Sequence, residues 1–452
     1  MAISGVDGAT RGNSLASGAG GAAAFSEILK EVYRPAVVDQ LNSKTVLMRM
    51  LGRRTEGIEG GKYHVNELRV GRNYGYGYAG EGGRLPDPQA QQFKQSKYDL
   101  RYSYGRIKFT GPSASSSRSD RGSFVRIMDT EVQGMAQDIQ HNDNRILFGD
   151  GSGRLCEISI ANSGAAGPHD VSNPGGITST GLGTQYLEAG MRVASVASDT
   201  GAVTVGTPPG AQFGSNRAGF ISSVDRSAGT ITFTGTWTAG SGTHYLYIAN
   251  EESTDLTGTS WGRGYEPNGI AALVDDADPA FQDGTSWPEG LGAVPVGDYP
   301  IWKANIIDNG GTAIPFHPDM FQQAMDLADI ASDSVPELWV TTHGIRRQYL
   351  NTLVAAKRYP NTMTLDGGFK ALTYDGRPIV VDKDCTRGRV YGLSLESIYL
   401  AYETDYDWMD QDGSVLQRMP DHDAFQACMY RYWNLCTDAR NRNCLIGDIL
   451  DL

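Results

Sequence analysis

The chain has 452 residues, of which 40% are hydrophobic and 20% charged, with 57 glycines and a net charge of −13. This length is enough for two to four domains, and the acidic balance argues against a protein that grips DNA through its phosphates. The sequence contains no run of about eighteen apolar residues that could span a membrane and no signal-peptide pattern at its N-terminus.

The first part of the chain predicts a flexible arm. Residues 1–24 are mostly Ala, Gly and Ser, which cannot bury a core. Short helical patterns follow in residues 25–50, and Pro35 interrupts them.

Two alternating segments then predict a long hairpin. Residues 62–70 and residues 93–110 each alternate in the manner of a strand. Between them, residues 71–88 interleave glycines with tyrosines. Because an isolated hairpin is barely stable in water, we expect this arm to lie on another surface.

A long amphipathic helix is predicted over residues 119–148. Ser119 or Asp120 can cap its start, and Gly149 can end it. At 1.5 Å per residue the helix would be about 40 Å long. Its apolar stripe predicts a strut with a sheet lying against one side; the stripe comprises Phe124, Met128, Val132, Met135, Ile139 and Ile146.

Residues 154–260 read as an inserted β-rich region. Short strand candidates recur about every ten residues with glycine turns between them, which is typical of a small β-barrel or sandwich. Long helical patterns return only afterwards, which favours an insertion. The candidates are residues 191–197, 202–205, 220–224, 230–234 and 244–248.

The last third of the chain has an α+β pattern. Residues 319–331 and 343–356 predict helices, the second with Thr342 as a possible cap. Strands are predicted over residues 337–340, 377–381, 389–393, 424–437 and 443–449.

Motifs that would indicate catalysis are weak. Gly75 to Gly80 matches the dinucleotide-binding fingerprint by letters, but no buried strand precedes it and no helix follows. The seven histidines form no zinc motif, and no nucleophile elbow or phosphate loop occurs. A pair of catalytic carboxylates stays an open alternative, because the distance between two carboxylates cannot be read from sequence. The five widely spaced cysteines predict free thiols in a reducing compartment. We therefore predict neither a cofactor nor a metal.

Charge is unevenly distributed. Asp405, Asp407, Asp410, Asp412 and Gly413 predict an acidic loop, solvated rather than calcium-binding. The hairpin segments are rich in Arg and Lys, whereas residues 403–423, which include this loop, are rich in acids. The two could meet between copies of the chain, or they could be independent solvated faces. The candidate residues for contacts between subunits are Arg69, Arg72, Tyr74, Tyr76, Tyr78, Lys97, Arg101, Asp405, Asp407, Asp410 and Asp412.

The order of these parts resembles that of tailed-bacteriophage major capsid proteins with the Hong Kong ninety-seven fold. A flexible arm leads to a basic two-stranded loop, and a long helix then runs into Asn-Asp-Asn-Arg-Ile-Leu-Phe-Gly-Asp-Gly at 142–151. The chain ends with Tyr-Arg-Tyr-Trp-Asn-Leu-Cys at 430–436 and Asn-Cys-Leu-Ile-Gly-Asp-Ile at 443–449. The resemblance covers nearly all of 25–452 except the insertion.

The resemblance implies an α+β fold with peripheral and axial domains, a spine helix and an extended loop that lies across a neighbouring subunit. The β-rich insertion departs from the minimal family pattern. The implied units are an N-terminal arm at 1–52, the extended loop at 53–112, the spine helix at 113–153, the inserted β-rich domain at 154–262, the peripheral domain continued at 263–340, the axial domain at 341–412 and C-terminal peripheral strands at 413–452.

The resemblance also implies a structural role without enzymatic activity. The protein would assemble with itself into hexamers and pentamers, in the host bacterial cytoplasm, as the icosahedral shell around double-stranded DNA. A separate scaffolding protein and a portal are expected, a decoration protein is possible, and DNA would be met only by non-specific proximity, with no membrane involved. Two alternatives stay open: a β-rich carbohydrate-active enzyme, or another virion protein of the tail or decoration kind.

Overall fold

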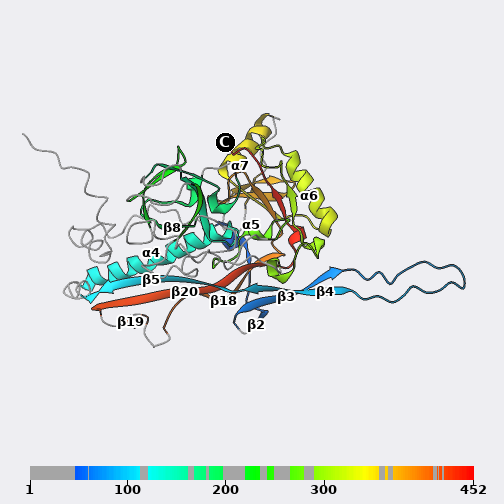
Figure 1. The fold of residues 1–452 in the computed structure, drawn as a ribbon, viewed down its shortest axis with the longest axis horizontal. Coiled ribbons are helices and arrows are strands. Elements are labelled where there is room, and N and C mark those ends of the chain that lie inside the picture. Colours follow the sequence, from blue (N-terminus) through cyan, green and yellow to red (C-terminus); the bar gives the residue numbers. More distant parts are fainter. Residues whose placement is uncertain are drawn as a thin grey trace, which may run out of the picture.

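The computed structural model in Figure 1 describes residues 46–59, 61–111, 121–160, 167–179, 183–196, 219–234, 242–248, 265–278, 290–355, 362–364, 370–410, 415, 417–419 and 422–451. The expected flexible arm at 1–24, most of the helical patterns before residue 50 and the strand expected at 202–205 lie outside these residues. The described part begins with α2 (Val46–Met50), whose Leu47 and Met48 are buried.

A long helix lies along two long strands and forms one end of the molecule (Figure 1). The helix α4 (Arg121–Leu147) confirms the prediction made for residues 119–148. Beneath it, β5 (Arg101–Thr110) pairs antiparallel with β20 (Ala424–Thr437) along the whole length of β5. The same sheet also contains β1 (Gly52–Arg54), β18 (Ile398–Trp408) and β19 (Gln417–Arg418).

Apolar side chains explain how the helix and this sheet pack. Val132 and Met135 of α4 contact a small cluster formed by Ile107, Phe109 and Ala427. Gly105 lies directly below the helix, where a Cβ atom would come within 2.8 Å of the sulfur of Met135. The strut predicted from the apolar stripe is therefore present, with the sheet on its apolar side.

The strand expected over residues 93–110 is instead two strands, and this prediction was wrong. β4 (Gln92–Asp99) pairs with β3 (Tyr63–Gly71), whereas β5 joins the sheet under α4. The chain changes sheets at Leu100, whose backbone N–H donates to the carbonyl of Lys62 at 2.8 Å. Buried residues fall on even positions before Leu100 and on odd positions after Arg101. This shift of alternation is the physical sign of the break.

Six strands form a closed barrel that lies above α4 (Figure 1). Their order is β10-β7-β6-β11-β8-β9, and the barrel has its own apolar core, which includes Ile158, Leu246 and Phe233. The strands are β6 (Arg154–Ile160), β7 (His169–Ser172), β8 (Arg192–Val196), β9 (Gly219–Asp225), β10 (Thr230–Phe233) and β11 (Gly242–Ile248).

A seven-stranded mixed sheet forms the rest of the body, with α6 (Asp319–Ser332) and α7 (His343–Ala355) beside it (Figure 1). Its centre is fully buried: all four residues of β13 and of β17 are inaccessible to solvent. Trp339, Phe321 and Tyr349 fill the space between this sheet and the helices. In spatial order the strands are β12 (Asn305–Ile307), β21 (Cys444–Ile446), β17 (Val390–Leu393), β13 (Leu338–Thr341), β16 (Arg377–Val381), β15 (Lys370–Tyr374) and β14 (Thr362–Thr364).

Short elements complete the described chain. They are β2 (Ile58–Glu59), α5 (Ile270–Leu273) and the 3-10 turns η1 (Pro174–Gly176), η2 (Gly183–Tyr186), η3 (Leu291–Ala293), η4 (Pro300–Trp302) and η5 (Arg440–Arg442).

The acidic segment predicted as a loop is in part a strand. Asp405 and Asp407 belong to β18, whose first four residues are completely buried and which pairs antiparallel with β20. The strand begins in the apolar run Ile398–Ala401 and continues because tyrosines, which favour strands, alternate with the acidic residues that follow. The register shifts twice along this second half, where the strand leaves the core.

Candidate assembly surface

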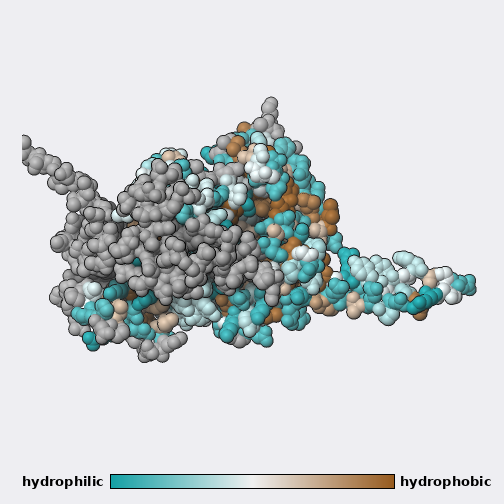
Figure 2. Space-filling model, in the orientation of Figure 1, coloured by the Kyte–Doolittle hydropathy of each residue, from teal (hydrophilic) through white to brown (hydrophobic). Residues whose placement is uncertain are grey.

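The hairpin predicted from the sequence projects from the body as a long arm (Figures 1 and 2). We define the arm as β3, β4 and the connecting residues 72–91. Those connecting residues contain no strand, and all of them except Gly75 are exposed. Figure 2 shows the arm as a thin projection with a mostly hydrophilic surface. Its contacts are few and local, such as the hydrogen bond of the Asn73 side chain to the carbonyl of Gln89 at 2.6 Å.

Aromatic side chains are displayed along the arm. Tyr74, Tyr76 and Tyr78 are 65%, 71% and 103% exposed, and Phe93 is 69% exposed. These rings bury almost nothing within one subunit. Exposed aromatic rings in a row are typical of contact surfaces, because Tyr supplies a large contact area and a polar group with little loss of entropy.

The basic residues predicted for contacts divide into two groups. Arg69 and Arg72 are exposed on the arm, and Lys97 lies on β4 with its ammonium 3.5 Å from the centre of the Tyr63 ring. Arg101 is different, because it begins β5 and is only 6% exposed. The structure therefore leaves Arg69, Arg72 and Lys97 accessible to a partner and removes Arg101 from that set.

The arm is anchored firmly at its base. Leu68 packs with Val294, Val296 and Trp302 in a separate apolar cluster. The fully buried Tyr98 donates a hydrogen bond from its hydroxyl to the carbonyl of Thr437 at 3.0 Å. The body thus fixes the direction of the arm, while its outer part has no support.

A polar network also lies at the base of the arm. The Nε2 atom of His64 is 2.9 Å from the hydroxyl of Tyr399, to which the Asn66 amide also donates. The Arg54 guanidinium lies 3.7 Å from the centre of the Tyr399 ring. Burial lowers the pKa of His64, with Arg54 acting in the same direction, so the imidazole is neutral at physiological pH.

The acidic candidates are also not equivalent. Asp405 pairs within the same chain with Arg53 at 2.8 Å and with Arg431 at 3.2 Å. Asp407 and Asp410 are exposed, whereas Asp412 lies outside the described residues. One acid and one base from the two oppositely charged segments therefore meet inside one subunit, which lessens the charge available for contacts between copies.

Arg431 forms a buried charge centre between α4 and the sheet. Its guanidinium is 3.0 Å from Asp143, and both side chains are 1% exposed. The hydroxyl of Tyr406 also donates to Asp143, at 2.7 Å. Burial raises the pKa of Asp143, and the neighbouring Arg431 opposes that shift. This pair holds the last part of the long helix to β20.

Sequence reasoning missed a second aromatic surface, which we call the tyrosine face: Tyr102, Tyr104, Tyr430 and Tyr432. These residues lie on the side of the β5–β20 pair opposite α4, and Tyr102 and Tyr104 are 51% and 55% exposed. The Tyr102 and Tyr432 rings stack edge to face with centres 4.9 Å apart. Partial burial among these rings raises the pKa of Tyr104 to about 12. The sequence did carry a signal for this surface, because the tyrosines lie two positions apart in both β5 and β20.

Other kinds of site find no support in the described part of the chain. No group of three or more His, Cys, Asp or Glu side chains there could hold a metal ion. The cysteines are unpaired thiols, and all except Cys428 are buried. No helix within the described ranges is long and apolar enough to cross a membrane.

Comparison with known proteins rests on structure alone. No family model and no curated protein matches the sequence. The structure is similar to the capsid asymmetric unit of cyanophage A-1(L), with a TM-score of 0.50 and 13% identity, over 94% of this chain and 98% of that one. Looser matches include the capsid of a native GTA particle, with a TM-score of 0.44 and 9% identity over 95% of this chain and 98% of that one. The holo-SrpI encapsulin complex of Synechococcus elongatus gives a TM-score of 0.42 and 8% identity over 94% of each chain.

The likeness to the cyanophage capsid covers almost the whole of both chains. This chain has a projecting arm, a long helix and two paired strands beneath the helix, which is the arrangement that the sequence resemblance implied. The protein therefore has the fold of a phage capsid protein, as its sequence predicted.

Proposed function

We propose that this protein is the major capsid protein of a tailed bacteriophage, and that many copies form hexamers and pentamers that close into an icosahedral head around double-stranded DNA. Its role is structural rather than catalytic. A closed array needs large surfaces that fit one another, because many modest contacts are repeated by symmetry. The fold shared with a phage capsid supports this proposal.

The single observation that carries the proposal is the arm. Residues 72–91 leave the body, have almost no contacts and expose a row of tyrosines. On a solitary protein such a hairpin would be unstable and a site for aggregation. On a neighbouring copy the arm would bury its rings, and those contacts would stabilise it, so an exposed arm of this kind is expected in a protein that assembles.

The tyrosine face is a second surface that an assembly would cover. It lies on a different sheet from the arm, and its four rings already pack against one another. A rigid, pre-ordered aromatic patch loses little entropy when a partner binds. We assign it, with Arg69, Arg72, Lys97, Asp407 and Asp410, to contacts between copies.

The unit boundaries and partners complete the proposal. The extended loop would occupy 53–112, the spine helix 113–153, and the axial domain 341–412. The barrel would be an added surface domain within 154–262, which its closed form and separate core support. Because the chain carries a net charge of −13, DNA would be enclosed by proximity rather than bound tightly. A scaffolding protein and a portal would act in assembly, in the cytoplasm of the bacterial host.

Substitution of the arm tyrosines tests this function. The triple change of Tyr74, Tyr76 and Tyr78 to Ser should leave the subunit folded, because these rings are mostly exposed and lie outside the described apolar clusters. If each ring contributes about 1 kcal/mol at a contact, assembly should require roughly 100-fold more protein. Tyr265→Ser is the matched control, since this tyrosine is 42% exposed on the body. Sedimentation velocity measures assembly of the triple variant and of the control. Equal assembly of the two would argue against the proposal.

A further inference from the structure

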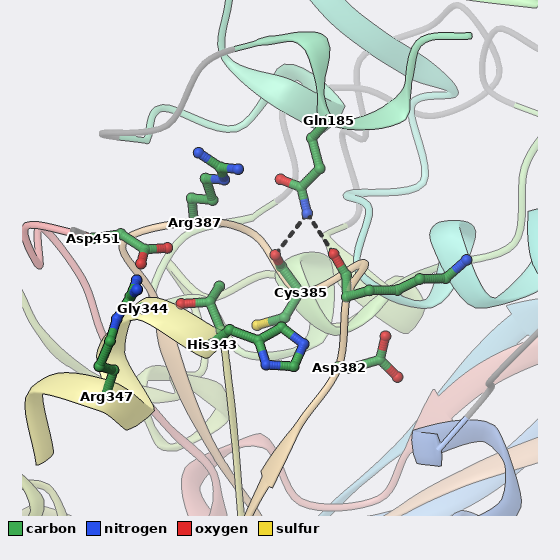
Figure 3. Close-up of a pocket in the computed structure, with 10 residues that line it drawn as sticks. Gln185, His343, Gly344, Arg347, Asp382, Cys385, Arg387 and Asp451 are labelled. Atoms are coloured by element: carbon green, nitrogen blue, oxygen red, sulfur yellow. Dashed lines mark hydrogen bonds between the residues drawn. The ribbon is translucent and has the colours of Figure 1, made fainter. Parts of the chain in front are cut away.

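A pocket of about 260 Å³, partly open to solvent, lies where the barrel meets the seven-stranded sheet (Figure 3). Its walls come from three distant parts of the sequence: η2 of the barrel, the start of α7, and the segment between β16 and β17. Asp451, near the end of the described chain, also lines it. No part of the assembly surface described above contributes to this pocket.

The barrel side of the pocket is held rigidly. The amide nitrogen of Gln185 donates to the carbonyl groups of Lys383, at 3.1 Å, and Cys385, at 2.8 Å. The hydroxyl of Tyr186 donates to the carbonyl of Asp384 at 2.6 Å. These bonds fix the Gln185 amide, and Figure 3 shows its oxygen turned away from the two carbonyls and toward the side where Arg387 lies. That oxygen is buried and has no hydrogen-bond partner among the described residues.

The opposite side is the N-terminus of α7, a helix of 13 residues. The first N–H groups of a helix lack partners within it and attract anions. Thr342 stands directly before the helix, where its hydroxyl was expected to act as a cap. Instead, its Oγ1 atom has no hydrogen-bond partner in the described structure, although the residue is only 7% exposed and lines the pocket. A buried hydroxyl without a partner is costly, which points to a missing ligand.

The charges around the pocket are mixed but favour an anion. Arg347 and Arg387 line it, and Asp451 is the opposing acid on its rim. The Lys383 ammonium is turned to His141, 2.7 Å away. The Asp382 carboxylate also lines the pocket, and its Oδ1 atom accepts from the Asn144 amide at 3.0 Å and from the backbone N–H of Asp384 at 3.0 Å. Two guanidinium groups, a helix N-terminus and the Thr342 hydroxyl thus lie around the pocket together with two carboxylates, those of Asp382 and Asp451.

We propose that this pocket binds hydrogen phosphate. Phosphate oxygens accept from the α7 N–H groups, the Thr342 hydroxyl and the two guanidinium groups, and the remaining phosphate hydroxyl donates to the Gln185 oxygen. Sulfate carries no proton at neutral pH and cannot satisfy that acceptor. The bound ion joins the barrel to α7, a role that does not depend on assembly.

Isothermal titration calorimetry of the full chain with inorganic phosphate tests this assignment. We expect one site per chain, with sulfate bound at least about ten-fold more weakly because it leaves the Gln185 oxygen unpaired. Arg387→Gln should weaken phosphate binding about ten-fold, and Thr342→Val about five-fold. Arg84→Gln, on the arm tip, is the control and should bind as the unchanged protein does.

Three results would overturn the assignment. They are the absence of phosphate binding at millimolar concentration, equal affinity for sulfate and phosphate, and unchanged binding in both pocket variants. The first of these would indicate that Asp451 neutralises the arginines from within the chain. Because Arg387 is exposed and Val has nearly the volume of Thr, both variants should fold, and phosphate-dependent thermal stabilisation provides a second readout.

Discussion

The buried pair of Arg431 and Asp143 allows a quantitative test of how the long helix is held to the sheet. Arg431→Met removes the partner of a carboxylate that is 1% exposed and 3.0 Å away. Breaking a buried ion pair from one side costs about 3–5 kcal/mol, because the remaining charge is left without compensation. Since domains are stable by about 5–15 kcal/mol, this one change should remove a large part of the stability.

A second substitution separates charge from packing. Asp143→Asn in the Arg431→Met background removes the stranded charge and keeps an acceptor for the Tyr406 hydroxyl. We expect it to restore about 2 kcal/mol or more of the loss. Asp407→Asn is the matched control, because Asp407 is exposed on β18 next to Tyr406 and its change should alter stability by less than about 0.5 kcal/mol.

Urea denaturation of unassembled subunits, followed through tryptophan fluorescence, to which the buried Trp433 contributes, measures these differences. The pH response gives an independent check. With its pKa raised in the folded state, Asp143 binds a proton more readily there than in the unfolded chain. Stability of the Arg431→Met variant should therefore rise as pH falls toward the unfolded value near 4. A loss of less than about 1 kcal/mol in the single variant, or no recovery of stability when Asp143→Asn is added, would contradict this role of the ion pair.

Three further outcomes are expected. Gly105→Val should destabilise the subunit by about 1–3 kcal/mol in chemical denaturation, because the added atoms meet the Ile139 side chain of α4. Gly105→Ala should destabilise it less, and equal losses for the two variants would contradict close packing at this position. Because burial lowers the pKa of His64, the stability of the subunit should decline as pH falls below about 6.5. His64→Gln should flatten that decline in thermal unfolding scans; the same pH dependence in the variant would contradict a role for His64. Reversal of Arg69 and Arg72 to Glu should lower assembly in light scattering without changing the melting temperature; normal assembly would remove these charges from the contact surface.

Much of the fold could be predicted where periodicity was strong and local. The bounds of β16 and β20 agree with the predicted strands, and α4 differs by only one or two residues at each end. In these elements hydrophobic spacing and tertiary burial coincide, so local pattern and global fold agree. The order of arm, helix and terminal strands carried the resemblance to capsid proteins for the same reason.

The errors arose where contacts with distant parts of the chain determine the local structure. The second half of β18 looked like a solvated loop because it is rich in acidic residues. Asp405 pairs with Arg53 and Arg431 on the strands that β18 joins, and this pairing cannot be read from the local sequence. Arg101 looked like a surface base, yet it lies on the buried side of β5, just after the shift of alternation at Leu100. The closure of the barrel likewise depends on which strands pair, and spacing does not reveal pairing.

The candidate sites show the same division. The arm tyrosines were predicted because glycine-rich, exposed sequence is legible locally. The tyrosine face required knowledge that β5 pairs with β20, and the pocket required that η2, α7 and the chain around Arg387 converge. Neither convergence leaves a signal within one segment of the sequence.

Electron microscopy of the purified protein tests the central claim most directly. We expect closed shells built from hexamers and pentamers, in which residues 72–91 of each copy lie against a neighbour and their tyrosines are buried. A protein that stays a single subunit at high concentration, with its arm still free in solution, would contradict it.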